Sequence, residues 1–260
     1  MRKCILLAVS LFAVVAAFAQ TQHKYNYIAA TFQPQYTFRF SNSKSVKRND
    51  SLSTSEKNRL GYSVFLQYQK ELGKNTTLQI GLQYTNTGFV KVVGNLLPKT
   101  VIHPDLEPLD QTILTIPSPT AELNYVFDYL DIPALLNRRV YFNQKKSKHW
   151  EFFVSYGASL NFLLQDRVAV RLKGFTIDND RSFNLKNTYL RPNFANISGM
   201  LGFRGNYNYS NKLGFITQPM LTVPLFNTTS GDLKYRLLSV GVNVGFFYNL
   251  DVKGEEEVIE

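Results

Sequence analysis

Apolar and polar residues alternate with a period of two along most of the chain after residue 25. The clearest stretch runs from Thr76 to Val92, where large apolar residues alternate with small or polar ones. A period of two is the spacing of a β-strand with two different faces. A helical turn of 100° per residue would instead scatter the apolar positions around the axis. The pattern therefore predicts an all-β chain.

Eight segments show this alternation, and short and long connections take turns between them. The segments are 25–40, 60–70, 76–92, 121–142, 150–164, 193–207, 213–228 and 237–250. The short connections are 71–75, 143–148 and 207–211, and the longer ones are 41–59, 93–118, 166–188 and 228–234. Short turns on one side and long loops on the other are typical of barrels of the outer membrane.

The two faces of the strands favour a membrane barrel over a soluble one. A soluble barrel has an apolar interior, whereas here the Gly, Ser, Thr, Gln and Asn face suits a lumen and the Leu, Val, Phe and Tyr face suits lipid. We therefore predict an eight-stranded antiparallel up-and-down transmembrane β-barrel over residues 20–250. An even number of strands places both termini in the periplasm.

The first residues read as a secretory signal peptide. Arg2 and Lys3 precede an apolar run that ends in Ala17-Phe18-Ala19, a small-x-small cleavage pattern. We expect a cleaved signal peptide over 1–19, because the apolar run is shorter than a membrane-spanning helix. The last residues, 251–260, are predicted to form an acidic periplasmic tail.

Composition agrees with an exported barrel. Of the 260 residues, 44% are hydrophobic and only 18% are charged, and the single cysteine, Cys4, lies in the leader, so no internal disulfide is expected. The formal charge of +10 falls to +8 without Arg2 and Lys3. Basic charge on an exported protein points to lipid phosphates rather than nucleic acid.

The first long connection carries much of this charge. Its basic residues are Lys44, Lys47, Arg48, Lys57 and Arg59. They are suited to lipopolysaccharide phosphates at the cell surface, with a solvated loop as the alternative.

The lumen of an eight-stranded barrel is filled by its own side chains, so no solute channel is expected. The alternation assigns four charged residues to the lumen: Glu122, Asp128, Glu151 and Arg204. Buried charges must be paired, which predicts ion pairs between Arg204 and one or more of these carboxylates. A path for protons or ions is the alternative.

No catalytic or metal-binding motif emerges from the sequence. The histidines beyond the leader are His23, His103 and His149. His103 and Asp105 imitate a catalytic dyad, but they are adjacent loop residues separated by a proline, without a visible nucleophile. We expect no enzyme activity, no metal ion and no cofactor.

One segment resembles a known family. Residues 129–136, Tyr-Leu-Asp-Ile-Pro-Ala-Leu-Leu, resemble the Tyr-Leu-(Glu/Asp)-Ile-Pro-Leu-Leu segment of the PorT-like outer-membrane β-barrel family of Bacteroidota, and residues 78–88 and 240–248 resemble two of its other strands. The resemblance implies an eight-stranded barrel and little about activity. Because proline cannot donate to a strand ladder, we interpret Pro133 as a structural kink near the periplasmic rim, with a partner-docking motif as the alternative.

The sequence thus predicts a non-catalytic outer-membrane protein of a Bacteroidota-type envelope that acts through its extracellular loops in a structural or binding role. Its expected partners are outer-membrane lipids and lipopolysaccharide, the barrel-insertion machinery and an envelope protein. The main alternative is an accessory subunit of a secretion or gliding assembly, as the PorT name suggests. A lipid-modifying or proteolytic enzyme and a small pore are further alternatives.

Overall fold

The computed structural model describes residues 26–41, 54–73, 75–94, 120–142, 150–173, 182–185, 190–210, 212–230 and 234–250. The predicted signal peptide and acidic tail lie outside these residues. So do His103, Asp105 and the loop residues Lys44, Lys47 and Arg48.

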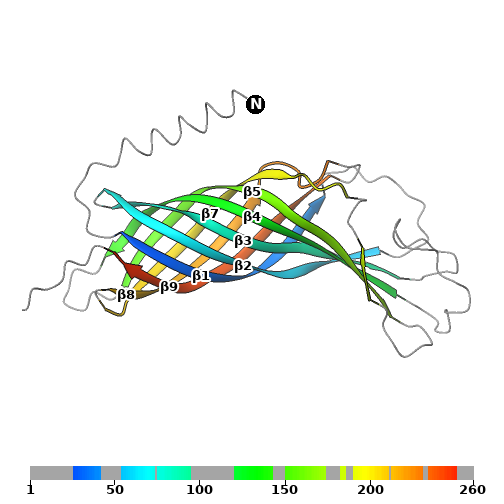
Figure 1. Ribbon diagram of the computed structural model, residues 1–260, viewed down its shortest axis with the longest axis horizontal. Coiled ribbons are helices and arrows are strands. Elements are labelled where there is room, and N and C mark those ends of the chain that lie inside the picture. The colour runs from blue at the N-terminus through cyan, green and yellow to red at the C-terminus, as the bar shows by residue number, and fades with distance from the viewer. Residues whose placement is uncertain are drawn as a thin grey trace, which may run out of the picture.

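Within these residues, nine antiparallel strands form one sheet, and eight of them close into a ring. The strands are β1 (Tyr27–Ser41), β2 (Thr54–Gly73), β3 (Thr76–Val93), β4 (Thr120–Phe142), β5 (Trp150–Lys173), β6 (Ser182–Leu185), β7 (Ala195–Asn208), β8 (Leu213–Pro224) and β9 (Tyr235–Asn249). Each strand of the ring pairs with the next ring strand along the chain, and β5 pairs with β7 because β6 lies outside the ring. Pairing of β1 with β9 closes the ring. The predicted eight-stranded barrel is therefore confirmed (Figure 1).

The short strand β6 lies outside this ring. It pairs only with residues Val168 to Arg171 of β5, at the end of the molecule where the longer connections lie. The opposite end holds the start of β1, the end of β9 and the three short connections (Figure 1). By the usual arrangement of outer-membrane barrels, we call these the outer and the periplasmic end.

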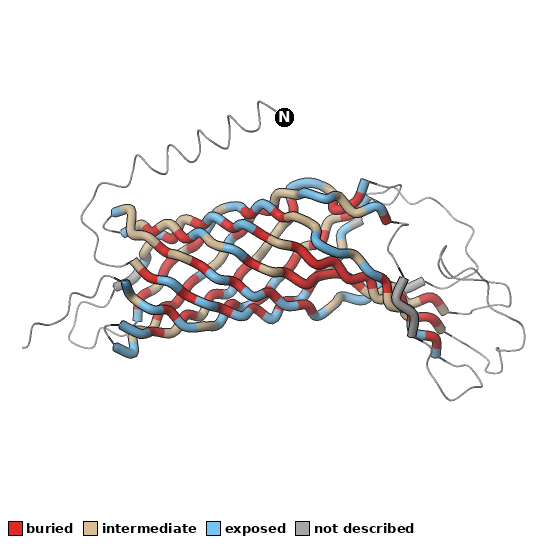
Figure 2. Tube along the Cα trace, in the orientation of Figure 1, coloured by how far each residue is buried: buried red, intermediate tan, exposed pale blue. Residues whose placement is uncertain are grey.

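Burial alternates along the strands as the pattern of faces predicts (Figure 2). Polar side chains such as Gln33, Ser63 and Gln79 are buried in the lumen, whereas large apolar ones such as Phe32, Val64 and Leu82 are exposed on the outside. These exposed apolar side chains form a belt around the barrel that suits lipid. Within the described residues, no helix is long and apolar enough to cross a membrane.

Strands β2 and β5 run further outward than the sequence predicts, whereas β3 and β4 end within one residue of the predicted segments. We expected strands to begin at Leu60 and to end at Leu164, yet β2 begins at Thr54 and β5 ends at Lys173. The reason lies in two β-bulges. The β2–β3 register shifts between Asn58 and Tyr62, and the β4–β5 register shifts beside Asp128 and Tyr129. The extra residue in each bulge exchanges the inward and outward positions beyond it. The alternation in the sequence therefore breaks at the bulge, although the strand itself continues toward the outer end.

Pro133 does not mark a kink at the periplasmic rim. It lies within β4, and the β3–β4 ladder lacks pairs only between Ile80↔Ala134 and Gln83↔Asp131, with the same register on both sides. Pro34 and Pro219 interrupt the ladders of β1 with β9 and of β7 with β8 in the same manner. A proline thus removes local pairing without bending the strand out of register, because the flanking pairs hold it.

Candidate functional site

Arg204 on β7 crosses the periplasmic half of the lumen and is fully buried. One terminal nitrogen donates to the Oε1 atoms of Gln69 at 2.6 Å and Gln79 at 2.8 Å, and its Nε donates to Oδ1 of Asn206 at 2.8 Å. The other terminal nitrogen donates to the Tyr27 hydroxyl, which itself donates to Gln69 at 2.6 Å. Strands β1, β2, β3 and β7 are therefore joined through one guanidinium group.

The predicted ion pairs of Arg204 are wrong. Among the described residues, each of the three carboxylates pairs with a different cation instead. The pairs are Glu151 with Arg139 at 3.6 Å, Asp128 with Arg167 at 3.8 Å, and Glu122 with Lys173 at 3.0 Å and Lys57 at 3.7 Å. Amide and hydroxyl oxygens supply the acceptors that a buried guanidinium requires, and the sequence pattern alone does not distinguish them from carboxylates.

The prediction also placed two of these carboxylates, Asp128 and Glu122, on the inner face of the sheet, whereas both lie on the outer face. Tyr129 and Asp131 point inward, so Asp128 between Phe127 and Tyr129 points outward. Its Oδ1 accepts from the Tyr84 hydroxyl at 2.8 Å and from Nδ2 of Asn86 at 2.6 Å. Glu122 shares this outer face, since Ala121 and Leu123 are the buried inner residues beside it.

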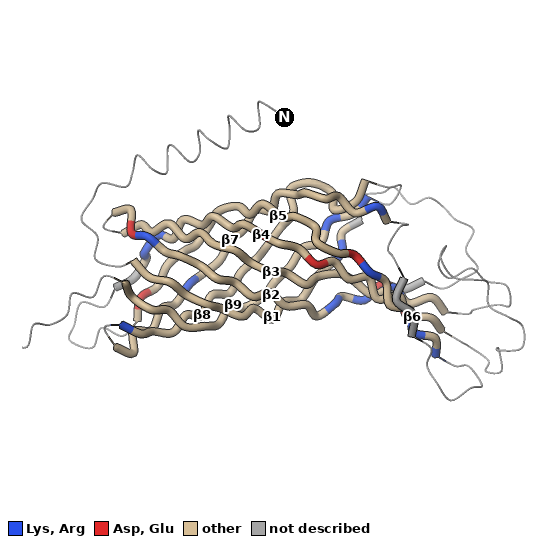
Figure 3. Tube along the Cα trace, in the orientation of Figure 1, with Lys and Arg blue, Asp and Glu red and all other residues tan. Residues whose placement is uncertain are grey.

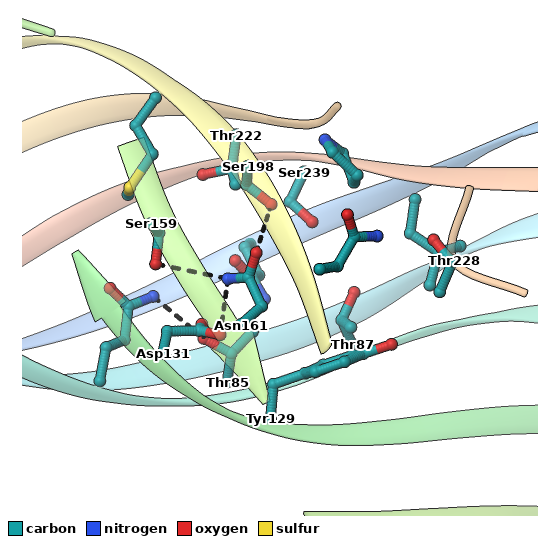
Figure 4. A pocket seen from close by; sticks show the side chains of 16 residues that line it. Thr85, Thr87, Tyr129, Asp131, Ser159, Asn161, Ser198, Thr222, Thr228 and Ser239 are labelled. Atoms are coloured by element: carbon teal, nitrogen blue, oxygen red, sulfur yellow. Dashed lines mark hydrogen bonds between the residues drawn. The ribbon is translucent and has the colours of Figure 1, made fainter. Parts of the chain in front are cut away.

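Asp131 is the lumen carboxylate that the sequence analysis missed. Its oxygens accept from the Thr85 hydroxyl at 2.5 Å and from Nδ2 of Asn161 at 2.7 Å, and Ser198 donates to Asn161 at 2.7 Å (Figure 4). The alternation along β4 indicates that Asp131 points inward, because Asp131 lies an even number of residues from Tyr129 and Leu135, which are both buried on the inner face.

A cavity of about 60 Å³ adjoins Asp131 in the middle of the barrel. Most of the side chains around it, from β1, β3, β4, β5, β7, β8 and β9, carry a hydroxyl or an amide group, and Met200, Pro224 and Leu237 add apolar surface. Asp131 is the one charged side chain among the described lining residues (Figure 4). A cavity of this volume has room for ordered water beside the polar groups. It gives the carboxylate neutral hydrogen-bond donors but no cation.

The outer half of the lumen is apolar, which corrects the prediction of a polar lumen throughout. A cluster of buried side chains joins the inner faces of β3, β4, β5 and β9: Phe89, Val93, Ala121, Leu123, Tyr125, Phe127, Tyr129, Val168, Val170, Leu172, Leu190, Tyr235 and Leu237. The Phe89 ring stacks on Tyr125 at 4.7 Å and meets Tyr235 edge-on at 5.4 Å. The Arg39 guanidinium lies 4.6 Å from the centre of the Phe89 ring and pairs with Glu56. Apolar packing therefore fills this level.

Among the described residues, charged positions lie mostly toward the two ends of the barrel and are sparse between them (Figure 3). On the outer faces of β2, β4 and β5, beyond the apolar belt, lie Lys57, Arg59, Glu122, Asp128, Arg167, Arg171 and Lys173. Arg59 donates from Nε to Oδ1 of Asn124 at 3.1 Å. Lys57 and Arg59 were expected in a loop, but both lie on strand β2. Within the described residues, no group of three or more His, Cys, Asp and Glu side chains gathers to hold a metal ion.

Comparison with known families agrees with this architecture. Residues 18–230 match the family described as "Outer membrane protein beta-barrel domain". The chain belongs to this family. Membership places the barrel in the outer membrane, so the exposed apolar belt faces lipid.

Several solved structures of outer-membrane barrels are similar in fold. Neisserial surface protein A is 10% identical with a TM-score of 0.44, covering 88% of this chain and 100% of that one. OprG from Pseudomonas aeruginosa is 11% identical with a TM-score of 0.44, covering 89% and 98%. The outer membrane protease OmpT from Escherichia coli is 7% identical with a TM-score of 0.34, covering 90% and 100%. No curated protein sequence matches this chain. At such identities, these likenesses say nothing about function.

Proposed function

We propose that this outer-membrane barrel is a non-catalytic protein with a binding or structural role at the cell surface, exerted through its outer end. The observation that carries the proposal is the contrast between its two parts. The described lumen is filled by the Arg204 network, the Asp131 layer and the apolar cluster. At the outer end, in contrast, strands β2 to β5 extend beyond the apolar belt, and the long connections of the chain follow from this end.

A filled lumen argues against a pore. Arg204 and the Phe89–Tyr235 pair block different levels of the barrel, so a solute would have to displace both a hydrogen-bonded guanidinium and packed rings. We expect the purified protein in planar bilayers to give no single-channel currents. Steady, reproducible conductance steps would contradict the proposal.

The decisive experiment shortens one end of the barrel at a time in cells that lack the native protein. In the first variant, a short Gly-Ser linker replaces residues 101–113 at the outer end. In the matched control, a linker of equal length replaces residues 144–147 at the periplasmic end. Heat-modifiable gel mobility checks that both barrels assemble. We expect the control to restore the envelope barrier to a large antibiotic and the outer variant to fail. Full restoration by an assembled outer variant would refute a role for this end.

We further propose that the chain lies in the PorT-like branch of Bacteroidota, on the strength of residues 129–136. This kinship offers the accessory subunit of a secretion or gliding assembly as the alternative function. Purification after mild detergent extraction separates the two roles. A barrel that acts alone brings no stoichiometric partner, whereas an envelope protein retained at equal amounts would favour the assembly subunit.

Catalysis is tested at the two residues that imitate a dyad. The double variant H103A/D105A is expected to leave both the lipid A profile and the protease activity of the cells unchanged. A changed lipid A profile or a lost proteolytic activity would instead identify an enzyme.

A further inference from the structure

Five cationic side chains share the outer face of the sheet just beyond the lipid-facing belt. They are Lys57, Arg59, Arg167, Arg171 and Lys173, and together we call them the basic surface. The side chains of Lys57, Arg167 and Lys173 are 62%, 47% and 45% exposed. The barrel therefore presents a concentrated positive charge to its surroundings at one level.

Strand register places these residues side by side. Lys57 lies opposite Val90, Val90 opposite Asn124, and Asn124 opposite Ala169, between Arg167 and Arg171 on β5. Four adjacent strands span about 14 Å across the sheet, at roughly 4.8 Å between neighbours. This width suits a large headgroup that carries more than one phosphate.

Hydrogen bonds and ion pairs hold the basic surface in place. Lys57 and Lys173 converge on Glu122, Arg59 binds Asn124, and Arg167 meets Asp128. The hydrogen bond from Lys173 lowers the pKa of Glu122 from its ordinary value of 4.5, so this carboxylate stays ionised at neutral pH. The basic surface contains five cationic side chains and only two carboxylates, Glu122 and Asp128, so its net charge is positive. An ordered cluster of this kind loses less entropy on binding an anion than free side chains would.

The position of the basic surface, directly beyond the lipid-facing belt, indicates which anion it meets. The apolar side chains next to it on the same strands and the same face are Leu60, Tyr62 and Leu164, all exposed. Because lipid tails cover these side chains, the lipid headgroups lie at the height of Lys57 to Lys173. Guanidinium and ammonium groups bind phosphate strongly through charge-assisted hydrogen bonds.

We propose that the basic surface binds the phosphate groups of lipids in the outer leaflet. This inference rests on the proposed function only in taking the end with the long connections as the cell-surface end. Phosphates of the outer leaflet would bridge β2 and β5 across the intervening strands and fix the barrel among its surrounding lipids.

The test measures lipid retained by the full barrel from nanodiscs. One set of discs contains phosphatidylcholine with a minority of bisphosphorylated lipid A, and the other contains the same amount of dephosphorylated lipid A. Native mass spectrometry counts the lipid that stays bound after transfer to detergent. We expect the wild type to retain the phosphorylated form preferentially.

Three variants link that preference to the basic surface. The triple variant K57A/R171A/K173A should retain at least about tenfold less phosphorylated lipid than the wild type, because each cation near a membrane surface adds to the attraction for anionic headgroups. E122Q should retain more, since it removes an opposing charge. The matched control K70A/R138A deletes basic side chains at the periplasmic end and should behave as the wild type. Unchanged gel mobility on heating verifies that each variant is folded.

Three results would overturn the proposal. The first is equal retention of the two forms of lipid A by the wild type. The second is a triple variant that matches K70A/R138A. Complete displacement of the lipid by inorganic phosphate would also contradict it, because the site would then suit a free anion. None of these readouts depends on the envelope barrier, so this inference and the proposed function fail separately.

Discussion

Arg204 shows how one side chain can organise a lumen. Its guanidinium is fully buried and serves acceptors on four strands, so its removal leaves the oxygens of Gln69, Gln79 and Asn206 without that donor. We expect R204L to lower the free energy of unfolding by about 3 kcal/mol, as loss of a buried charge network does. Urea unfolding in detergent, followed by tryptophan fluorescence, measures the change. R138L, at the exposed rim, is the control, and an equal loss in both variants would contradict the role of the network.

Asp131 and Asp128 provide a second residue-scale comparison, because they lie three residues apart on opposite faces of β4. Asp131 meets neutral donors, whereas Asp128 also has Arg167. Replacing Asp131 by Asn removes a buried charge and keeps the shape, so D131N should raise the free energy of unfolding by about 1 kcal/mol. D128N should lower it by up to about 1 kcal/mol. The same urea experiment compares the signs, and a loss of stability in D131N would show that the negative charge is needed.

At the scale of the elements, the main feature is the level of the two β-bulges, beyond which strands β2 to β5 continue outward from the barrel. The bulge in β2, the bulge beside Asp128 and the positive φ of 154° at Gly88 lie at this level. A side chain at Gly88 would collide with the Tyr125 carbonyl oxygen. G88A should therefore reduce the fraction of barrel that becomes heat-modifiable, because both backbone and packing oppose it.

Gly199 is the matched control for Gly88. A Cβ there meets no atom closer than 3.8 Å, at Leu225. G199A should therefore assemble like the wild type. If G88A assembled equally well, the close approach of β3 to β4 at this level would not be required for folding.

The same level explains what the sequence could and could not predict. Below it, strict alternation identifies strands and faces, as the exposed Leu82 and buried Gln83 confirm. Beyond it, each bulge inverts the phase, so Val168 and Leu172 face inward and charged Arg167 and Arg171 face outward on a segment that reads as a loop. The partners of Arg204 were not predictable for another reason. They come from strands far apart in the chain, and a strand pattern carries no information on which side chains meet across a lumen.

For the molecule as a whole, the orientation in the membrane can be tested directly. The single cysteine, Cys4, lies in the predicted signal peptide, and C4S gives a cysteine-free background in any case. We expect K173C to react with a membrane-impermeant maleimide in intact cells, because the outer end faces the medium. N75C, in the short connection between β2 and β3, should react only after the cells are permeabilised. The reverse pattern would place the basic surface and the long connections in the periplasm.

The long hairpin of β4 and β5 also has a practical consequence. Its paired strands continue past the bulge as far as Thr120 and Lys173, a rise of roughly 30 Å along the strand at about 3.3 Å per residue. The hairpin thus acts as a rigid stalk anchored in a barrel that has no free edge within the membrane. A peptide epitope grafted between Lys173 and Ser182 would emerge directly above the lipid headgroups on a support anchored in the barrel, which makes this scaffold suitable for displaying antigens on living cells.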